Sequence, residues 1–241
     1  MKNFPDKAHS KIFLFFSEIF QSVVPLFKSK FFYIGLASLI FGTQLNFASQ
    51  TYLHNYMSEG KTLPMLSDLI LDHLPVINLS FFYDFFCLLS SLIIGIYVIH
   101  KKEYNQIPFI LLICGILLVI RGIFIVLTPF GNPPLFNGSG SPFNGFSKFE
   151  LGVYPSGHVG NVFMYLLLVR DKTYKYILFI CLSIVIVALF LSHGHYSIDI
   201  LSGLFFAYAI RSFGNKYFTM FDLGRKEEFH VQTYTGRKPE A

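Results

Sequence analysis

The chain has 241 residues, of which 53% are hydrophobic and 18% aromatic, and its mean hydropathy is +0.54. This composition excludes an ordinary soluble domain and predicts an integral membrane protein. The formal net charge is +5 at pH 7. The basic residues follow the membrane topology described below, so we expect no nucleic-acid partner.

The first 30 residues form the predicted N-terminal segment. Residues 8–27, AHSKIFLFFSEIFQSVVPLF, mix apolar and polar residues, which is typical of an amphipathic helix that lies in the cytoplasmic membrane interface. About 30 residues are too many for the n-region of a cleaved signal peptide, so we interpret the next apolar stretch as a membrane span.

Six apolar stretches follow, most of them with the roughly 20 residues that a membrane crossing requires. Because period-2 alternation is absent, the predicted fold class is all-α, an integral membrane bundle of six transmembrane helices over residues 31–213. A basic cytoplasmic tail is expected at 214–241. The six stretches are residues 31–51, 78–99, 107–128, 157–169, 174–192 and 195–212.

Lysines and arginines set the predicted orientation, because short cytoplasmic loops carry an excess of them. Sixteen fall in segments on the same side as the N-terminus, whereas only Lys61 and Lys148 fall in the opposite loops. Both termini are therefore predicted to be cytoplasmic. A homo-oligomer is compatible with this topology.

Two long loops are predicted on the extracytoplasmic side. Residues 52–77 contain KTLPMLSDLILDHLP, whose mixture of apolar and acidic residues predicts a short helix on the membrane surface. Residues 129–155 are rich in Gly, Pro, Asn and Phe, which excludes regular structure. A loop of this length often covers a site, so residues 131–148 are the expected lid.

Five ionisable residues fall within or at the start of predicted spans, where a charge is costly and points to function. They are Asp84, Arg121, His158, His195 and Asp199. Each alone has a structural explanation, such as an arginine that snorkels to the headgroups. In the predicted topology, however, all five lie toward the extracytoplasmic side, which favours one shared site.

Three of these residues suit nucleophilic and acid–base chemistry. His195 and Asp199 are four residues apart, so they share a face if both are helical. The carboxylate then fixes the imidazole tautomer and leaves the other nitrogen as a nucleophile or base. His158 is a second imidazole that can protonate a leaving group.

Three residues suit the binding of phosphate oxygens. Arg121 carries a fork of donors that matches phosphate. Ser156 and Gly157 begin a predicted helix, whose free N–H groups bind anions. No metal-ligand spacing such as CxxC or HExxH occurs, so we expect neither a metal nor a cofactor.

Two motifs resemble those of the type 2 phosphatidic acid phosphatase superfamily. They are PSGH at 155–158 and SHGHYSIDIL at 192–201, and the second is most similar to the sphingomyelin synthase branch. RGIFIVLTP at 121–129 is also similar to that branch. The resemblance runs from about residue 63 to residue 213 and implies an enzyme that transfers or hydrolyses a phospholipid head group through a phosphohistidine.

The resemblance also implies roles for individual residues. His195, oriented by Asp199, would attack the phosphorus, and His158 would protonate the leaving oxygen and then activate the acceptor. The implied phosphate-binding residues are Arg121, Ser156 and Gly157, and the implied supporting residues are Asp84, His193 and Tyr196. The implied substrates are phosphatidylcholine, phosphatidylethanolamine or phosphatidate, with ceramide, diacylglycerol or water as the acceptor.

The acceptor and one other class of function stay open. Leu189 stands where lipid phosphatases have an arginine, and ELGVYPSGH differs from the Cys-Gly-Asp-Tyr run of the synthases, so transfer and hydrolysis are both compatible. The alternative is a transporter or channel that uses the same polar residues as an ion or proton pathway. Few polar residues occupy the inner halves of the spans, which favours an enzyme.

Overall fold

The computed structural model describes residues 17–136 and 154–224, and these residues form helices and no β-strand. Residues 17–23 are α-helical and continue into the 3-10 helix η1, Val24–Lys28. The rest of the expected interfacial helix, most of the expected lid and most of the expected basic tail lie outside the described residues.

A helix occupies each of the six predicted apolar stretches. Four of the six, namely α2, α3, α4 with the preceding η3, and α6, are long and apolar enough to cross a membrane, which is compatible with a multi-pass integral membrane protein. The apolar α5 has only 12 residues, and α7 falls outside this group of four. The helices are α2 Lys30–Ser58, α3 Ser80–His100, α4 Ile107–Leu127, α5 Gly157–Leu168, α6 Lys172–Leu191 and α7 Ser197–Tyr217, with shorter 3-10 helices η2 Leu71–His73, η3 Tyr104–Gln106 and η5 Thr219–Phe221.

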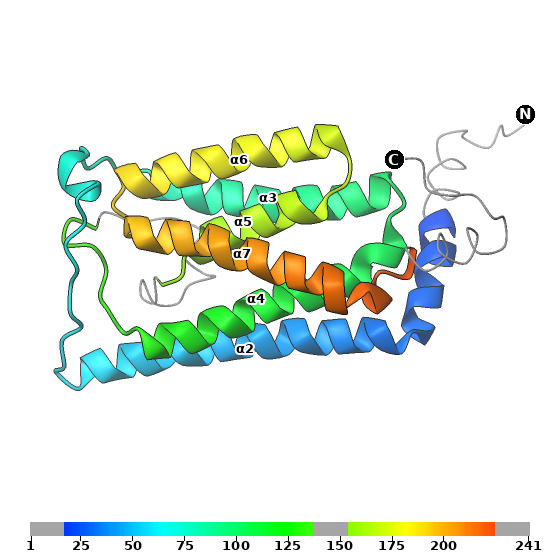
Figure 1. Ribbon diagram of the computed structural model, residues 1–241, viewed down its shortest axis with the longest axis horizontal. Coiled ribbons are helices and arrows are strands. Elements are labelled where there is room, and N and C mark those ends of the chain that lie inside the picture. The colour runs from blue at the N-terminus through cyan, green and yellow to red at the C-terminus, as the bar shows by residue number, and fades with distance from the viewer. Residues whose placement is uncertain (1–16, 137–153, 225–241) are drawn as a thin grey trace, which may run out of the picture.

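Successive helices run in opposite directions along the bundle (Figure 1). α2 packs along α4, α3 packs against α6, and the short α5 contacts α3, α4, α6 and α7. The start of α3, the end of α4 and the starts of α5 and α7 therefore lie at the same end of the bundle (Figure 1). All five ionisable residues singled out in the sequence belong to this end.

The contact between α2 and α4 is close because small residues face each other. A Cβ atom on Gly115 would lie 2.4 Å from Ser38 Oγ and 2.5 Å from the Ser38 carbonyl carbon. A Cβ atom on Gly42 would lie 2.5 Å from the Gly115 carbonyl oxygen. Only glycine fits at these distances, as in other closely packed membrane helices. This contact holds the middle of α4 against α2.

The short helix α5 is enclosed by its neighbours. Val159, Val162, Met164 and Leu168 are completely buried. The last turn of α5 would leave carbonyl groups without intrahelical partners, and the Gln106 amide Nε2 donates a 2.9 Å hydrogen bond to the Leu168 carbonyl. Burial and this cap fix α5 although it is too short to reach across a bilayer alone.

Two predictions for the first outer loop were wrong. α2 continues to Ser58 rather than ending at 51, because no glycine or proline interrupts residues 43–59 before the turn at Gly60, where φ is 82°. The predicted surface helix is only the 3-10 turn η2. Asp68 Oδ1 accepts hydrogen bonds from the N–H groups of Ile70 and Leu71, and such side-chain contacts compete with helix formation.

Candidate active site

Two histidines from different segments face each other at one end of the bundle. His158 lies in the first turn of α5, and His195 lies in the loop between α6 and α7. Their ring centroids are 6.0 Å apart, with an angle of 65° between the planes. The His158 side chain is 30% exposed and that of His195 only 6%. One small group can therefore contact both imidazoles, with His158 on the open side.

The position of His195 differs from the sequence prediction, which included it in the sixth span. α7 begins at Ser197 because Tyr196 has extended backbone angles and its N–H donates a 2.9 Å hydrogen bond to Asp199 Oδ2. His195 Nδ1 lies 3.4 Å from the same oxygen. His195 and Asp199 thus meet across a helix cap rather than along one helical face, and the carboxylate both caps α7 and contacts the imidazole.

His158 has a separate carboxylate partner. Its Nε2 atom lies 2.8 Å from Oδ1 of Asp84, in the second turn of α3, and the Tyr83 ring packs edge-on against the imidazole at 5.1 Å. The second oxygens of both pairs, Asp84 Oδ2 and Asp199 Oδ1, are buried without a hydrogen-bond partner among the described residues. Buried unpaired oxygens are rare in proteins and call for a functional explanation.

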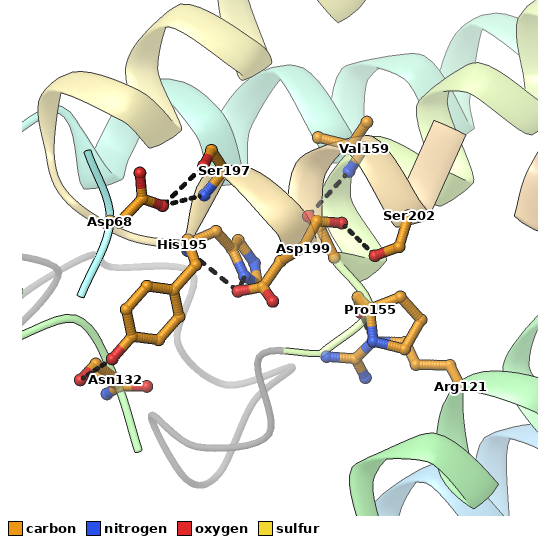
Figure 2. A network of polar contacts seen from close by, with 11 residues as sticks. Asp68, Arg121, Asn132, Pro155, Val159, His195, Ser197, Asp199 and Ser202 are labelled. Atoms are coloured by element: carbon orange, nitrogen blue, oxygen red, sulfur yellow. Dashed lines mark hydrogen bonds and ion pairs between the residues drawn. The ribbon is translucent and has the colours of Figure 1, made fainter. Parts of the chain in front are cut away.

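Arg121 reaches the turn that begins α5. Its Nε donates a 3.0 Å hydrogen bond to the carbonyl of Pro155, which lies beside it in Figure 2. Its Nη1 donates to Asn46 Oδ1 of α2. A Cβ atom on Gly157 would lie 2.8 Å from Arg121 Nε, so the missing side chain at this position admits the guanidinium. The arginine therefore joins α2, α4 and the start of α5.

Ser156 links the starts of α5 and α7. Its hydroxyl accepts a 3.4 Å hydrogen bond from the Val159 N–H, which caps α5, and its own N–H donates to the Asp199 carbonyl at 3.1 Å. A Cβ atom on Gly203 would lie 2.9 Å from the Ser156 carbonyl oxygen. The predicted anion site at the start of α5 thus adjoins Arg121 and the helix that carries Asp199.

The surroundings of His195 favour its neutral form. This residue lies in the loop outside both helices, where burial lowers the pKa of its imidazole from the ordinary value of 6.5. The hydrogen bond and charge of Asp199 act in the opposite direction but are outweighed by burial. Near pH 7, His195 is therefore neutral, and if Nδ1 donates its proton to Asp199, the lone pair on Nε2 is available for attack.

The two supporting residues that neighbour His195 differ in their contacts. His193 is buried with φ of 50°, and its Nε2 has no hydrogen-bond partner among the described residues. Tyr196 is also buried, and its hydroxyl accepts a hydrogen bond from the Leu66 N–H and donates one to the Asn132 carbonyl. Tyr196 therefore connects the site to the segments that follow α2 and α4, whereas His193 makes no such link among the described residues.

Two residues of this network were not predicted from the sequence. Asn46 lies within the first predicted span and binds Arg121, so extending the search for ionisable residues to amides would have found it. Asp68 accepts hydrogen bonds from Ser197 at the start of α7. Its segment, KTLPMLSDLILDHLP, predicted only a surface helix and no contact with the site.

The candidate site combines two imidazoles, two carboxylates and a guanidinium at one end of the bundle. Within residues 17–136 and 154–224, no group of three His, Cys, Asp or Glu side chains is arranged to hold a metal ion. No family model and no curated protein sequence matches the chain. The geometry of the two histidine–carboxylate pairs is therefore the basis for assigning a function.

Proposed function

We propose that the protein is an integral membrane enzyme that removes a phospholipid head group through a phosphohistidine and passes it to a lipid alcohol or to water. In this proposal α2 to α7 all cross the membrane, both termini are cytoplasmic, and the site lies on the extracytoplasmic side. The four long apolar helices and the excess of lysine and arginine on the opposite side support this topology.

The observation that carries the proposal is the pair of imidazoles 6.0 Å apart, each with its own carboxylate. Phosphoryl transfer needs a nucleophile on one side of the phosphorus and a proton donor on the side of the leaving oxygen. The buried His195 suits the first role, and the more open His158 suits the second. The resemblance of PSGH and HYSID to the phosphatidic acid phosphatase superfamily agrees with these roles.

The proposed reaction has two balanced steps. In the first, the Nε2 lone pair of His195 forms a bond to phosphorus, the bond to the diacylglycerol oxygen breaks, and protonated His158 donates its Nδ1 proton to that oxygen. In the second, the acceptor hydroxyl gives its proton to His158 while its oxygen attacks phosphorus and the bond to His195 breaks. Asp84 orients His158 through its contact with Nε2, and Asp199 orients His195.

The phosphoryl oxygens are assigned to the residues around the start of α5. Charge accumulates on these oxygens during transfer, and donors fixed in advance lower the barrier. Arg121 already lies against Gly157, and Ser156 caps the helix whose free N–H groups lie next to His158. These three residues would hold the phosphate between the two imidazoles.

An apolar groove beside the site supports a lipid as substrate. It has a volume of about 640 Å³ and is lined by residues of α5, α7 and the preceding turn, among them Tyr154, Phe163, Ile198, Ser202 and Phe206. The Ser202 hydroxyl donates a hydrogen bond to the backbone carbonyl of Asp199 (Figure 2), so the groove adjoins the helical turn that carries this residue. Acyl chains of phosphatidylcholine, phosphatidylethanolamine or phosphatidate suit such a surface.

The proposal is tested by incubating the purified protein with head-group-labelled phosphatidylcholine or phosphatidylethanolamine, with and without ceramide or diacylglycerol. A labelled second lipid identifies a transferase, and water-soluble labelled phosphate ester identifies a hydrolase. Both products are expected to disappear in His195→Ala. The matched control is His73→Ala, because His73 lies in the exposed turn η2 on the same side. Intact lipids together with ion flux across vesicles would instead favour the transporter alternative.

We expect that acidification decreases the activity only below pH 6.5. The nucleophile must be neutral, and the pKa of His195 is lowered by burial from 6.5, so protonation removes activity only as the pH falls through this lower value. The measurement is kcat/KM as a function of pH. Asp199→Asn should move the acidic limb further down, because Asp199 raises the pKa of His195. A limb above pH 6.5 would assign the nucleophile to another group.

A further inference from the structure

The outer segment after α2 binds the start of α7 through one carboxylate. Asp68 Oδ2 accepts hydrogen bonds from the Ser197 N–H at 2.6 Å and from the Ser197 hydroxyl at 2.7 Å (Figure 2). Asp68 Oδ1 accepts from the N–H groups of Ile70 and Leu71 at 3.0 and 3.3 Å. Asp68 is only 9% exposed, so its carboxylate is directed at protein donors rather than at solvent.

A second contact joins the same two segments. The Tyr196 hydroxyl accepts a 3.0 Å hydrogen bond from the Leu66 N–H and donates a 3.2 Å hydrogen bond to the Asn132 carbonyl. Tyr196 is 1% exposed, so this hydroxyl is fixed. Residues 66–71 therefore hold both Tyr196 and Ser197, the two residues that follow His195.

Because of these contacts, the two carboxylates near the start of α7, those of Asp68 and Asp199, accept hydrogen bonds from different donors. The first N–H groups of a helix need acceptors from outside the helix, and Tyr196 offers no side-chain cap to Ser197. Asp68 accepts hydrogen bonds from the Ser197 N–H and hydroxyl. Asp199 accepts one from the Tyr196 N–H and contacts His195. Without Asp68, the Ser197 N–H and hydroxyl would lose the acceptor that they share.

Asp68 is also charged at neutral pH. Burial alone raises the pKa of its carboxyl, but the hydrogen bonds from Ser197, Leu71 and Ile70 outweigh this effect and bring the pKa below the ordinary value of 3.8. Hydrogen bonds to a charged acceptor are stronger than those between neutral groups. The ionised side chain is therefore a firm anchor for the start of α7.

We propose that Asp68 is a positioning residue of the candidate active site, which fixes Ser197 from outside the helix and thereby holds His195 against Asp199. This inference rests on the proposed function and assigns no contact between Asp68 and substrate. His195 lies before the first turn of α7, so helical hydrogen bonds do not fix its backbone. Its geometry relative to Asp199 depends on the intervening residues, two of which, Tyr196 and Ser197, are held by the outer segment.

The test compares Asp68→Ala with Asp72→Ala in the full-length protein, with the soluble probe p-nitrophenyl phosphorylcholine. Asp72 lies on the same outer segment but is exposed. Asp68→Ala is expected to lower kcat by about 100-fold, because a small displacement of a reacting group has an effect of this order, with KM changed by less than about twofold. The acidic limb of its pH profile should move down, since the contact by which Asp199 raises the pKa of His195 is weakened.

Two further variants test the hydrogen bonds themselves. Ser197→Ala removes only the hydroxyl contact and should have a smaller effect, and combining it with Asp68→Ala should add little, because both changes break one network. If Asp68→Ala fails to fold, kcat is measured for the isosteric variant Asp68→Asn instead. A lower kcat at an unchanged melting temperature supports positioning, and an unchanged kcat overturns it.

The outcomes separate this inference from the proposed function. An active wild type in which Asp68→Ala behaves like Asp72→Ala overturns the positioning role alone. An inactive wild type that forms no labelled protein overturns the proposed function and the positioning role together. A fall in kcat without the downward shift of the acidic limb would assign Asp68 to general stability instead.

Discussion

His195→Ala is expected to lose all phosphorylation of the protein, with a rate decrease on the order of 10⁴-fold or more, whereas His158→Ala should lose only part of the reaction. The reason is that p-nitrophenolate leaves without a proton, so an artificial substrate that carries it does not need the acid His158. In the first step, His158→Ala should therefore approach the wild-type rate with p-nitrophenyl phosphorylcholine. With phosphatidylcholine it should fall by about 10²- to 10⁴-fold.

The measurement is the burst of p-nitrophenol when enzyme is mixed with excess probe. The wild type should turn over continuously, and His158→Ala should release about one equivalent and then slow, because no base activates the acceptor. The protein should then carry an acid-labile phosphocholine group. Release of p-nitrophenol by His195→Ala at the wild-type rate would rule out His195 as the nucleophile. His73→Ala serves as the control, since His73 is exposed and its Nδ1 atom contacts the Leu69 carbonyl of its own segment.

Gly115→Ala is expected to destabilise the protein by about 1–3 kcal/mol, although alanine is the better helix former. The added Cβ would lie 2.5 Å from the Ser38 carbonyl carbon, so the backbones of α2 and α4 must move apart. The displacement also separates Asn46 from Arg121, so activity should decrease as well. Thermal unfolding in detergent, followed by circular dichroism, measures the first effect.

Gly95→Ala provides a control of opposite sign. Gly95 lies within α3, and no atom lies within 4 Å of a Cβ built there. The substitution should raise the melting temperature, because alanine favours a helix over glycine by up to about 1 kcal/mol. Equal shifts for Gly95→Ala and Gly115→Ala would mean that α2 and α4 do not pack at this distance.

The positions of the helices followed from the sequence because each apolar stretch is bounded by polar or turn-forming residues. The end of α2 did not, since residues 52–58 are polar enough to resemble a loop and yet contain nothing that stops a helix. The start of α7 was also missed. A local capping contact, Asp199 with the Tyr196 N–H, and a tertiary contact, Asp68 with Ser197, define it, and spacing along the chain does not report the second.

The sequence predicted those residues of the site that are ionisable and lie within apolar stretches. Asp84, Arg121 and His158 are conspicuous among apolar neighbours, and the structure brings them to one end of the bundle. The pairing of His158 with Asp84 depends on how α3 packs beside α5, which no local pattern encodes. Asn46 escaped notice because a neutral amide in an apolar stretch carries a weaker signal than a charge.

The lengths of α3 and α4 have a consequence for where the chemistry takes place. Asp84 precedes the inner end of α3 at His100 by 16 residues, and Arg121 follows the inner end of α4 at Ile107 by 14 residues, or about 24 and 21 Å of helix. A hydrocarbon layer is about 30 Å thick. In the proposed topology the phosphorus of the bound substrate would therefore lie several ångströms below the glycerol backbones of the surrounding leaflet. Two lipids can meet at that depth without leaving the bilayer, whereas water must travel through the protein to reach it.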